Sequence, residues 1–397
     1  MDVRDVVILS AVRTPIGKFG GCFRDLSAVD LAAVAIREAV SRAGISPSDV
    51  NEVIMGHVLQ GGFGMNTARQ AAVKAGIPWE VPGYTVNKVC ASGLKAVSLG
   101  AASICLEENE VVVVGGMESM SNAPYFIKPS WRWGVKFSFT GEKIMDLMVH
   151  DGLTDPFNGM FMGEEAEMTA KKHGITREEA DQFAVRSHMR AAEATEKGYF
   201  LEEIVPIELK TKQGEITIDK DEGIRPDTSM EKVSRLKPVF RPDGIITAAN
   251  ASQLSDGAAA LVLSSRRFAE ERGLKPLARI LGYDSSTIES KDFIEAPIPS
   301  VRRLMKKIGM KLDDVDFFEH NEAFALATLV VTKELDIPLD KVNVFGGAVA
   351  LGHPLGASGA RILVTLLNVL RIKGGTVGVA TICHGGGGAH SLAVELM

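Results

Sequence analysis

The sequence has little of what marks several classes of protein. It contains 4 cysteines in 397 residues, none in a CxxC spacing, and 6% aromatic residues. Four cysteines are too few for a disulfide framework, and their spacing does not indicate a zinc site, so we expect reduced thiols. No segment reaches the about 20 consecutive apolar residues of a membrane-spanning helix. The short apolar run near the start is flanked by charges, unlike a secretory signal, so we expect a cytoplasmic protein outside the membrane.

A strong excess of one charge is also missing. The chain carries 44 Lys+Arg and 50 Asp+Glu, a formal net charge of -6, without a block rich in lysine or arginine. Nucleic acid is therefore not an expected partner. The 46% hydrophobic and 24% charged residues are typical of a globular protein. The length exceeds the roughly 100–200 residues of one compact domain, which predicts several domains or a fused duplication.

Hydrophobic patterning alternates between strand and helix and indicates an α/β fold. In the first part of the chain, strands are predicted at 5–10, 51–56, 83–86 and 110–116, and helices at 28–43, 66–76 and 91–106. The last third repeats this order, with strands predicted at 276–283, 315–320, 342–347 and 376–386, and helices at 300–308, 323–335 and 358–372. We therefore predict two similar halves whose matching helix and strand ends form a composite site near an internal two-fold axis.

The middle of the chain breaks this alternation. Roughly 120–250 is rich in loops that contain Met, Phe, Gly and Pro, with one amphipathic helix near 177–197, and it reads as an inserted loop domain. Within it, 224–244 is relatively basic in an otherwise acidic chain. Taken alone, this segment is either a solvated loop or a surface for a phosphate-bearing tail.

Cys90 is the first candidate for chemistry. It lies where a short predicted strand ends and a helix of small and apolar residues begins. The free N–H groups and positive dipole at a helix start stabilise a thiolate, which predicts a low pKa and a reactive nucleophile. The alternative is a buried small hydrophobic residue, which is the role expected for Cys22 and Cys105.

His353 is the second candidate, in the glycine-rich segment GGAVALGHPLGASGAR. Small residues on both sides of one imidazole favour catalysis over packing. The nearby Ser358 does not form a serine hydrolase elbow, because Ala360 stands at the last glycine position of GxSxG.

Cys383 is the third candidate, at the end of an apolar strand and before the four glycines 385–388. Glycine N–H groups can approach a developing oxyanion without obstruction from side chains. A metal site built from Cys383, His384, His390 and His353 is not expected, since Cys383 and His384 are neighbours on a strand and point to opposite faces. Asn321, where a strand passes into a helix, either caps that helix or holds a catalytic water.

These segments, in order, resemble the thiolase family. VCASG, GGMESMSNAPY, NEAFA, GGAVALGHPLGASGAR and the CxGGG pattern around Cys383 coincide with its motifs, and the likeness extends over essentially the whole chain. The resemblance implies a five-layered αβαβα fold built from two similar halves with an inserted loop domain. It places the N-terminal half at 1–119 (completed by about 255–275), the loop domain that binds coenzyme A at 120–254, and the C-terminal half at 276–397.

The resemblance also implies site residues and substrates. Cys90 matches the nucleophile, His353 and Cys383 match the proton-transferring pair, and Asn321 and Gly385 match contributors to two oxyanion holes. No permanently bound cofactor and no metal are implied, with coenzyme A and acetyl-CoA acting as substrates. The remaining matches are to coenzyme A and acyl contacts: Arg225, Lys232, Phe240, Ala248, Ser252, Leu153, Met162, Phe293 and Phe324.

Within the family, the chain looks most like short-chain acetoacetyl-CoA thiolases, which implies a homotetramer built as a dimer of dimers. Phe161 replaces an imidazole of those relatives, and Phe293 falls where some have Met. His188 occupies the place of a Tyr that helps hold potassium in other relatives, so potassium activation is doubtful. His384 fills the variable place of CxG, where we expect an outward-facing structural role.

The expected activity is that of an acetyl-CoA C-acetyltransferase of fatty acid metabolism. It would interconvert two acetyl-CoA with acetoacetyl-CoA and coenzyme A by Claisen condensation, through an acyl group on Cys90. One alternative is a 3-ketoacyl-CoA thiolase of broader chain length in β-oxidation. Others are a non-catalytic acyl-CoA- or lipid-binding relative and a ketoacyl synthase relative, although the latter would use two His residues where this chain has Cys383. The sequence leaves the direction of the reaction open.

Overall fold

The computed structural model describes residues 2–134, 143–211 and 214–397. The predicted alternation of strands and helices is present in both halves. In the first half it runs β1 (Val6–Arg13), α1 (Ala28–Arg42), β3 (Glu52–Gly56), α2 (Thr67–Ala75), β4 (Gly83–Val86), α3 (Ser92–Cys105), β5 (Val111–Ser119) and later β10 (Ser255–Ser265). In the second half it runs β11 (Ala278–Thr287), α8 (Pro297–Ile308), β12 (Phe317–His320), α9 (Ala325–Leu335), α11 (Leu355–Lys373), β13 (Val377–His384) and β14 (Gly388–Leu396).

The strands form one mixed sheet in the order β12-β13-β14-β11-β1-β10-β5-β3-β4, with the short β2 (Gly17–Lys18) paired to β10. The two halves of this sheet meet where Val7 and Ile8 of β1 pair with Arg279 and Ala278 of β11. Each half has the same pattern: β3 is parallel to β5, which is antiparallel to β10, and β12 is parallel to β13, which is antiparallel to β14. The predicted duplication is therefore visible in the topology.

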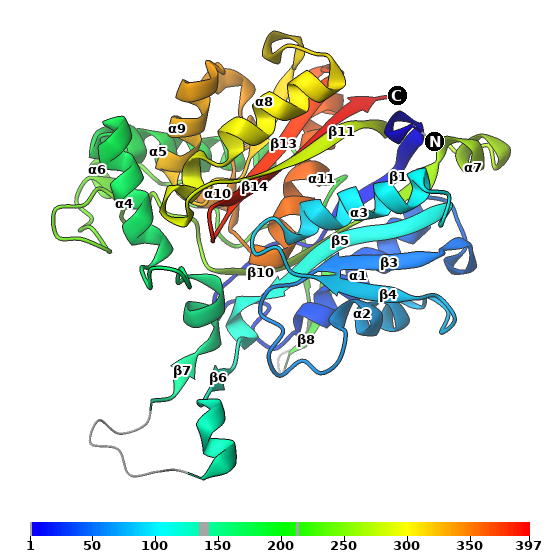
Figure 1. Ribbon diagram of the computed structural model, residues 1–397, viewed down its shortest axis with the longest axis horizontal. Coiled ribbons are helices and arrows are strands. Elements are labelled where there is room, and N and C mark those ends of the chain that lie inside the picture. The colour runs from blue at the N-terminus through cyan, green and yellow to red at the C-terminus, as the bar shows by residue number, and fades with distance from the viewer. Residues whose placement is uncertain (1, 135–142, 212–213) are drawn as a thin grey trace.

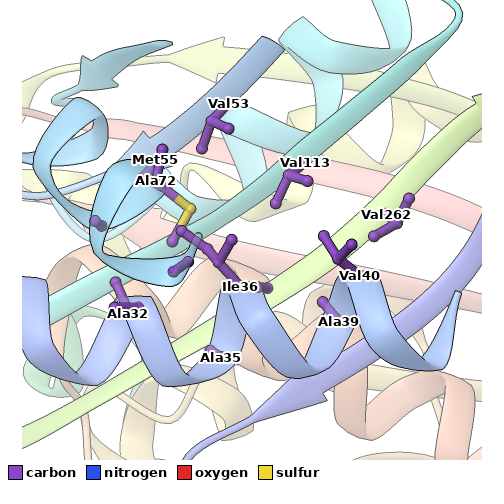
Figure 2. Close-up of a cluster of buried hydrophobic side chains, with 14 of the residues drawn as sticks. Ala32, Ala35, Ile36, Ala39, Val40, Val53, Met55, Ala72, Val113 and Val262 are labelled. Atoms are coloured by element: carbon purple, nitrogen blue, oxygen red, sulfur yellow. The ribbon is translucent and has the colours of Figure 1, made fainter. Parts of the chain in front are cut away.

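Helices cover the sheet halves in layers, and the predicted αβαβα order is confirmed. Helices α1 and α2 pack on the outer face of the first half, and α8 and α9 pack on the outer face of the second (Figure 1). Helices α3 and α11 lie between the halves and share one apolar cluster with strands of both. On the outer face, Ile36 of α1 packs among Met55, Val113 and Val262 of the sheet (Figure 2).

Helix α1 begins where local chemistry dictates. Ser27 and Asp30 form a reciprocal capping box, in which the Ser27 side chain accepts the N–H of Asp30 and the Asp30 carboxylate accepts the N–H of Ser27. Alanines on the inward face, among them Ala32 and Ala39, let the helix lie close to the sheet. This fixes the first half as a rigid support for the segment that carries Cys90.

The central helices approach at backbone distance. A methyl group at Gly93 of α3 would lie 2.8 Å from Ala360 N and 2.9 Å from Gly356 O of α11, and one at Gly359 would lie 2.5 Å from Leu94 N. Only glycine fits at such a crossing. The glycines of the two predicted site segments therefore bring the starts of α3 and α11 together. Helix α11 is long and apolar enough to span a membrane. However, 89% of its apolar 18-residue stretch is buried inside the protein, as in a core helix.

The strand predicted at 342–347 is wrong. The structure has only a single bridge between Phe318 and Val342 there, at the place that β4 occupies in the first half. Asn343 has a φ of 48°, and its side chain donates to the main-chain oxygen of His320 and to Glu322. An asparagine that satisfies the backbone in this way competes with strand pairing, so the chain turns before α10 (Ala348–Leu351).

The inserted region lies beside the two halves. It contains α4 (Met162–His173), α5 (Arg177–Glu196), α6 (Met230–Val233) and the paired strands β6 (Tyr125–Phe126) with β7 (Met145–Asp146) and β8 (Ile207–Thr211) with β9 (Gly214–Ile218). Helix α5 confirms the helix predicted near 177–197, whereas α4 was not predicted. Strands β6 and β7 form an arm that projects from the body (Figure 1), and α7 (Arg266–Glu271) follows β10.

Candidate active site

Cys90 lies in the turn between β4 and α3, as predicted. The Ser92 hydroxyl donates to Val89 O at 2.6 Å and accepts the N–H of Lys88 at 2.8 Å, which closes the turn. Val89 has a φ of 47°, a strained conformation for a β-branched residue. The sequence around Cys90 is thus folded to present one side chain at the start of α3.

The thiol of Cys90 is neutral at rest. Burial raises the pKa of Cys90 to about 12, and the nearby Glu118 carboxylate also raises it, whereas the N–H groups of Gly385 and Cys90 itself act to lower it. The low pKa predicted from the helix start is therefore wrong, because desolvation outweighs the N–H donors of Gly385 and Cys90. Attack by this sulfur requires a base that removes its proton.

His353 lies in the matching turn of the second half, directly before α11, and is 6% exposed. Its Nδ1 lies 2.6 Å from Ser358 Oγ, and the Ser358 hydroxyl donates to Pro354 O at 2.9 Å. Because that hydroxyl proton is used, Oγ accepts Nδ1–H, which leaves a lone pair on Nε2. Burial, with a further contribution from the charge of Arg361, lowers the pKa of His353 to about 3. The imidazole is therefore neutral and can accept a proton at Nε2.

Asn321 follows β12 and lies beside the imidazole. Its Nδ2 is 3.4 Å from Nε2 and 3.5 Å from Nδ1 of His353, so the amide lies over the ring. Helix α9 begins only at Ala325, with Phe324 at its N-cap position, so the capping role considered for Asn321 is wrong. Its buried Oδ1 has no hydrogen-bond partner among the described residues, which leaves the amide available to a bound molecule.

Cys383 is the last residue but one of β13 and is 1% exposed. Burial, together with the nearby Cys90, raises the pKa of Cys383 well above its usual value. The two cysteines are close enough that a charge on one opposes a charge on the other. After Cys383 the chain turns back through Gly386 and Gly387, each with a φ of 82°. This turn directs the N–H of Gly385 to the sulfur of Cys90.

His384 does not face outward as predicted. It is only 9% exposed, and a methyl group at Gly388 would lie 2.2 Å from its ring. Its Nδ1 lies 2.8 Å from Gly385 O, so the imidazole stabilises the glycine turn through this contact. Within the described ranges, no group of three or more His, Cys, Asp and Glu is arranged to hold a metal ion.

The residues matched to the acyl region (Leu153, Met162 and Phe293) and two of those matched to the pantetheine tunnel (Phe240 and Phe324) share apolar clusters with the two cysteines. Phe293, Phe324, Phe240 and Met162 belong to the same apolar cluster as Cys383. Leu153 belongs to the cluster that includes Cys90. The rings of Phe240 and Phe324 meet edge to face at 6.4 Å. Both cysteines are therefore packed against apolar side chains.

The residues matched to coenzyme A contacts lie further out. Ser252 is partly buried and donates its N–H to Ala323 O at 3.0 Å, while Ala248 is exposed. Arg225 is exposed, and its N–H donates to Nδ1 of His188. Lys232 is also exposed and pairs with Asp227. These cationic side chains lie at the surface of the inserted region rather than beside the sulfurs.

The assembled groups have complementary chemistry. Two neutral thiols, one neutral imidazole with an Nε2 lone pair, one side-chain amide and the N–H of Gly385 come from segments that meet at the starts of α3 and α11 and the end of β13. Such a set can form and break a thioester and can move a proton beside a carbonyl, with N–H donors for the resulting oxyanions.

Comparisons with known proteins agree with this chemistry. Residues 6–267 match the model of "Thiolase, N-terminal domain", and residues 274–396 match that of "Thiolase, C-terminal domain". The chain belongs to the thiolase family. It is 48% identical over 391 residues to the "Probable acetyl-CoA acyltransferase" of Staphylococcus aureus (strain MRSA252), an alignment that covers 98% of each chain. It is 46% identical over 396 residues to the "Acetyl-CoA acetyltransferase" of Syntrophomonas wolfei, covering 99% of this chain and 100% of that one.

A solved structure confirms the thiolase fold. The crystal structure of the Bacillus anthracis acetyl-CoA acetyltransferase superposes with a TM-score of 0.96 at 46% identity, covering 99% of this chain and 98% of that one. The family predicted from the ordered motifs is therefore confirmed, and so is the class of enzyme, an acyltransferase.

Two supporting residues of this thiolase were missed from the sequence. Ser358 was considered only as a hydrolase nucleophile, yet it orients His353; its place in the first turn of the helix after His353 was the available signal. Glu118 accepts the N–H groups of Val58 at 3.2 Å and Gly356 at 2.9 Å, and so ties the first half to the start of α11. Glu118 lies in the segment GGMESMSNAPY, which was the available signal, but its role depends on partners from distant parts of the chain.

Proposed function

We propose that this thiolase is an acetyl-CoA C-acetyltransferase that interconverts two acetyl-CoA with acetoacetyl-CoA and coenzyme A. The observation that carries the proposal is the close approach of the helix start after Cys90 to the helix start after His353, where Gly93 meets Gly356, together with the closeness of Cys383 to Cys90. Relatives that are 46% identical over nearly their full lengths carry the name acetyl-CoA acetyltransferase, which supports the choice of substrate.

In the proposed first step, His353 Nε2 takes the proton of the Cys90 thiol. The thiolate attacks the carbonyl carbon of acetyl-CoA, the carbon–sulfur bond to coenzyme A breaks, and the leaving thiolate recovers the proton from His353. An acetyl group then remains on Cys90. The raised pKa of Cys90 makes its thiolate short-lived and strongly nucleophilic, so it needs the adjacent base.

In the second step, the Cys383 thiol releases its own proton to water, to regain it when the cycle ends, and the resulting thiolate removes an α-proton from a second acetyl-CoA. The resulting carbanion attacks the acetyl carbon, a carbon–carbon bond forms, and the bond to the Cys90 sulfur breaks. The proton now on Cys383 then neutralises the Cys90 thiolate. Because a charge on Cys90 raises the pKa of Cys383, only one of the two sulfurs is ionised at a time.

Two sets of donors would stabilise the oxyanions of these steps. A water held by Asn321 with His353 would serve the thioester of the second acetyl-CoA. The N–H groups of Cys90 and Gly385 would serve the acetyl group on Cys90, which agrees with the direction of the Gly385 N–H toward that sulfur. Loss of one such donor typically lowers the rate by about 10²–10³.

The inserted region, 120–254, is the proposed coenzyme A domain between the halves at 1–119 (with 255–275) and 276–397. Arg225 and Lys232 would meet the phosphates, Ser252 and Ala248 would lie along the pantetheine, and Phe240 and Phe324 would line its path inward. Exposed cations ahead of an apolar, aromatic passage fit a ligand with a charged head and a thin tail. No cofactor needs to remain bound, because coenzyme A is itself the carrier.

A second candidate is a thiolase of broader chain length. The Staphylococcus aureus relative carries the more general name acetyl-CoA acyltransferase. Phe161 and Phe293 are the residues that would decide the acyl chain length. Phe293 is buried in the same cluster as Cys383 and limits the space there, whereas Phe161 is 45% exposed. The packed Phe293 favours the four-carbon substrate.

We also propose a homotetramer located in the cytoplasm. The β6–β7 arm exposes Tyr125 (69%), Trp131 (41%) and Trp133 (83%), an aromatic surface that fits contacts between copies in the homotetramer we propose. The four cysteines Cys22, Cys90, Cys105 and Cys383 are all free thiols, which suits the reducing cytoplasm.

Steady-state thiolysis tests the proposed function. We expect faster turnover of acetoacetyl-CoA than of 3-ketohexanoyl-CoA or longer esters, and a mass increase of one acetyl group on Cys90 after brief mixing with acetyl-CoA. A preference for six carbons or more would favour the broader enzyme. Absence of acetyl transfer with all esters would refute the catalytic proposal.

A further inference from the structure

A buried pair of carboxyl groups lies in the segment between the two apolar clusters of the site. Asp155 and Glu165 are both 0% exposed. Asp155 belongs to the loop 153–162, and Glu165 lies in the first turn of α4. Asn158 Nδ2 bridges them, at 3.2 Å from Asp155 Oδ2 and 2.6 Å from Glu165 Oε1. We call Asp155 and Glu165 the carboxyl pair.

The pair shares one proton. Burial raises the pKa of Glu165 to about 8, and its hydrogen bond to Asp155 and the charge of Asp155 also raise it. Although burial acts in the other direction, hydrogen bonds from the Phe157 N–H and the Ser290 hydroxyl hold the pKa of Asp155 below its usual value. Glu165 Oε2 meets no N–H or O–H donor among the described residues, so Glu165 carries the proton and donates it to Asp155.

The pair lies inside a loop that closes on itself. The N–H of Met162 donates to Leu153 O at 3.0 Å, which joins the two ends of the loop. Within it, the N–H of Asp155 donates to Met160 O, and the N–H of Gly159 donates to Asp155 O, each at 2.8 Å. The loop is therefore one compact unit, and the carboxyl pair attaches it to α4.

Both ends of this loop contact the catalytic region. Leu153 belongs to the apolar cluster that includes Cys90, and Met162 belongs to the cluster that includes Cys383. A methyl group at Gly385 would lie 3.2 Å from Met162 Sδ. A shift of the loop therefore moves two side chains that line the space beside the sulfurs.

We propose that the carboxyl pair, by sharing one proton, holds the loop 153–162 in place and so positions Leu153 and Met162 beside the two sulfurs. Loss of the proton puts two negative charges together in a buried site, loosens the loop and slows the reaction. Asp155 and Glu165 are positioning residues in this scheme, and its effect on turnover rests on the proposed function.

The surroundings of the pair do not offset a second charge. Asp292, in the 3-10 turn η6 (Ser290–Glu295), faces Glu165 and adds a negative charge. Lys172 of α4 pairs with Asp292 and Glu295 instead, and its side chain is 53% exposed. Because the folded pKa of Glu165, about 8, lies above its ordinary value of 4.5, its stabilising effect is complete below about 4.5 and is lost as the pH rises through about 8.

The substitution Glu165→Gln tests the proposal, because glutamine donates to Asp155 at every pH. We expect the ratio of kcat/KM for E165Q to that of the wild type to rise about tenfold from pH 7 to pH 9, since a group with a pKa of 8 loses its proton over this range. The ratio cancels the ionisation of coenzyme A and of the catalytic groups. Glu289→Gln, which removes an exposed charge near the loop, is the matched control and should give a constant ratio.

Hydrogen exchange of the loop gives a measure that does not depend on activity. After correction for the intrinsic pH dependence, the amides of Phe157, Gly159 and Met162 should lose protection between pH 7 and pH 9 in the wild type and keep it in E165Q. Equal protection in both proteins at pH 9, or a constant kcat/KM ratio in an active enzyme, would overturn the proposal. pH-dependent protection in a protein without thiolysis activity would support the carboxyl pair and refute the proposed function.

Discussion

The turn before α3 and the turn before α11 occupy the same place in the two halves, yet one carries Cys90 and the other His353. Burial raises the pKa of the thiol and lowers the pKa of the imidazole, so it favours the neutral form of both. A pair that is neutral at rest can exchange one proton inside an apolar site without bringing in a counter-ion. The duplication thus supplies two equivalent positions, and the different residues at them supply an acid and a base.

The support for these two positions also differs. In the first half β4 pairs with β3 over four residues, whereas in the second half only Val342 pairs with β12. His353 is instead held by Ser358, while the sulfur of Cys90 receives the N–H of Gly385. The His353 imidazole therefore needs a fixed orientation, whereas the Cys90 sulfur needs removal from water.

Removing the side chain of Cys90 or of His353 should have the largest effect on the rate of acetyl transfer. Cys90→Ala should lower kcat for acetyl transfer by at least about 10³, because no acyl-enzyme can form. His353→Asn should lower it by about 10²–10⁴ through loss of the base. Kinetics of acetoacetyl-CoA thiolysis measure both, with Cys22→Ala as a control that leaves the rate unchanged. Substantial acetyl transfer by C90A would contradict the assignment of the nucleophile.

The pH dependence of alkylation sharpens the contrast between a neutral thiol and a thiolate at a helix start. With the pKa of Cys90 raised to about 12, its rate of reaction with iodoacetamide should rise about 100-fold from pH 7 to pH 9 without a plateau. Peptide mass spectrometry of the labelled site gives the rate. A plateau below pH 8 would indicate a stabilised thiolate and would restore the prediction made from the helix dipole.

Ser358→Ala removes the group that aims the imidazole and leaves the imidazole itself. We expect kcat to fall about tenfold, since a hydrogen bond of this kind contributes roughly 1 kcal/mol and Nε2 loses its fixed orientation. Ser358→Thr, which keeps the hydroxyl, should restore most of the rate. If S358A left kcat and its pH profile unchanged, the Nδ1 contact would have no role in orienting His353.

Gly93→Ala tests how closely the two turns are held. Because the added methyl would meet Ala360 N and Gly356 O, overpacking should cost about 1–3 kcal/mol and lower the Tm by a few degrees. Gly76→Ala at the end of α2 is an informative control, since its neighbourhood is open but its φ of 97° requires glycine. Calorimetry measures the loss of stability in both variants, and the thiolysis assay separates overpacking between the helices from backbone strain. G93A should also lose activity, whereas G76A should lose only stability.

Much of this arrangement follows from local sequence signals. Period and turn residues predicted most of the strands and helices, and glycines beside Cys90, His353 and Cys383 marked where the backbone comes close. The strand at 342–347 failed because one side chain, Asn343, takes the backbone partners that a strand would need. The pKa of Cys90 could not be predicted, because its desolvation comes from the other half of the chain. The carboxyl pair was missed for the same reason, since only folding brings Asp155 to Glu165.

The glycine crossing of α3 and α11 has a mechanical consequence. Where backbone touches backbone there is no rotamer to adjust, so the spacing between nucleophile and base is set by atoms that cannot swing aside. Each helix is held by backbone contacts near its N-terminal end, next to the turn that carries Cys90 or His353. The site can therefore accept changes at its acyl-facing wall without altering the distance over which the proton travels.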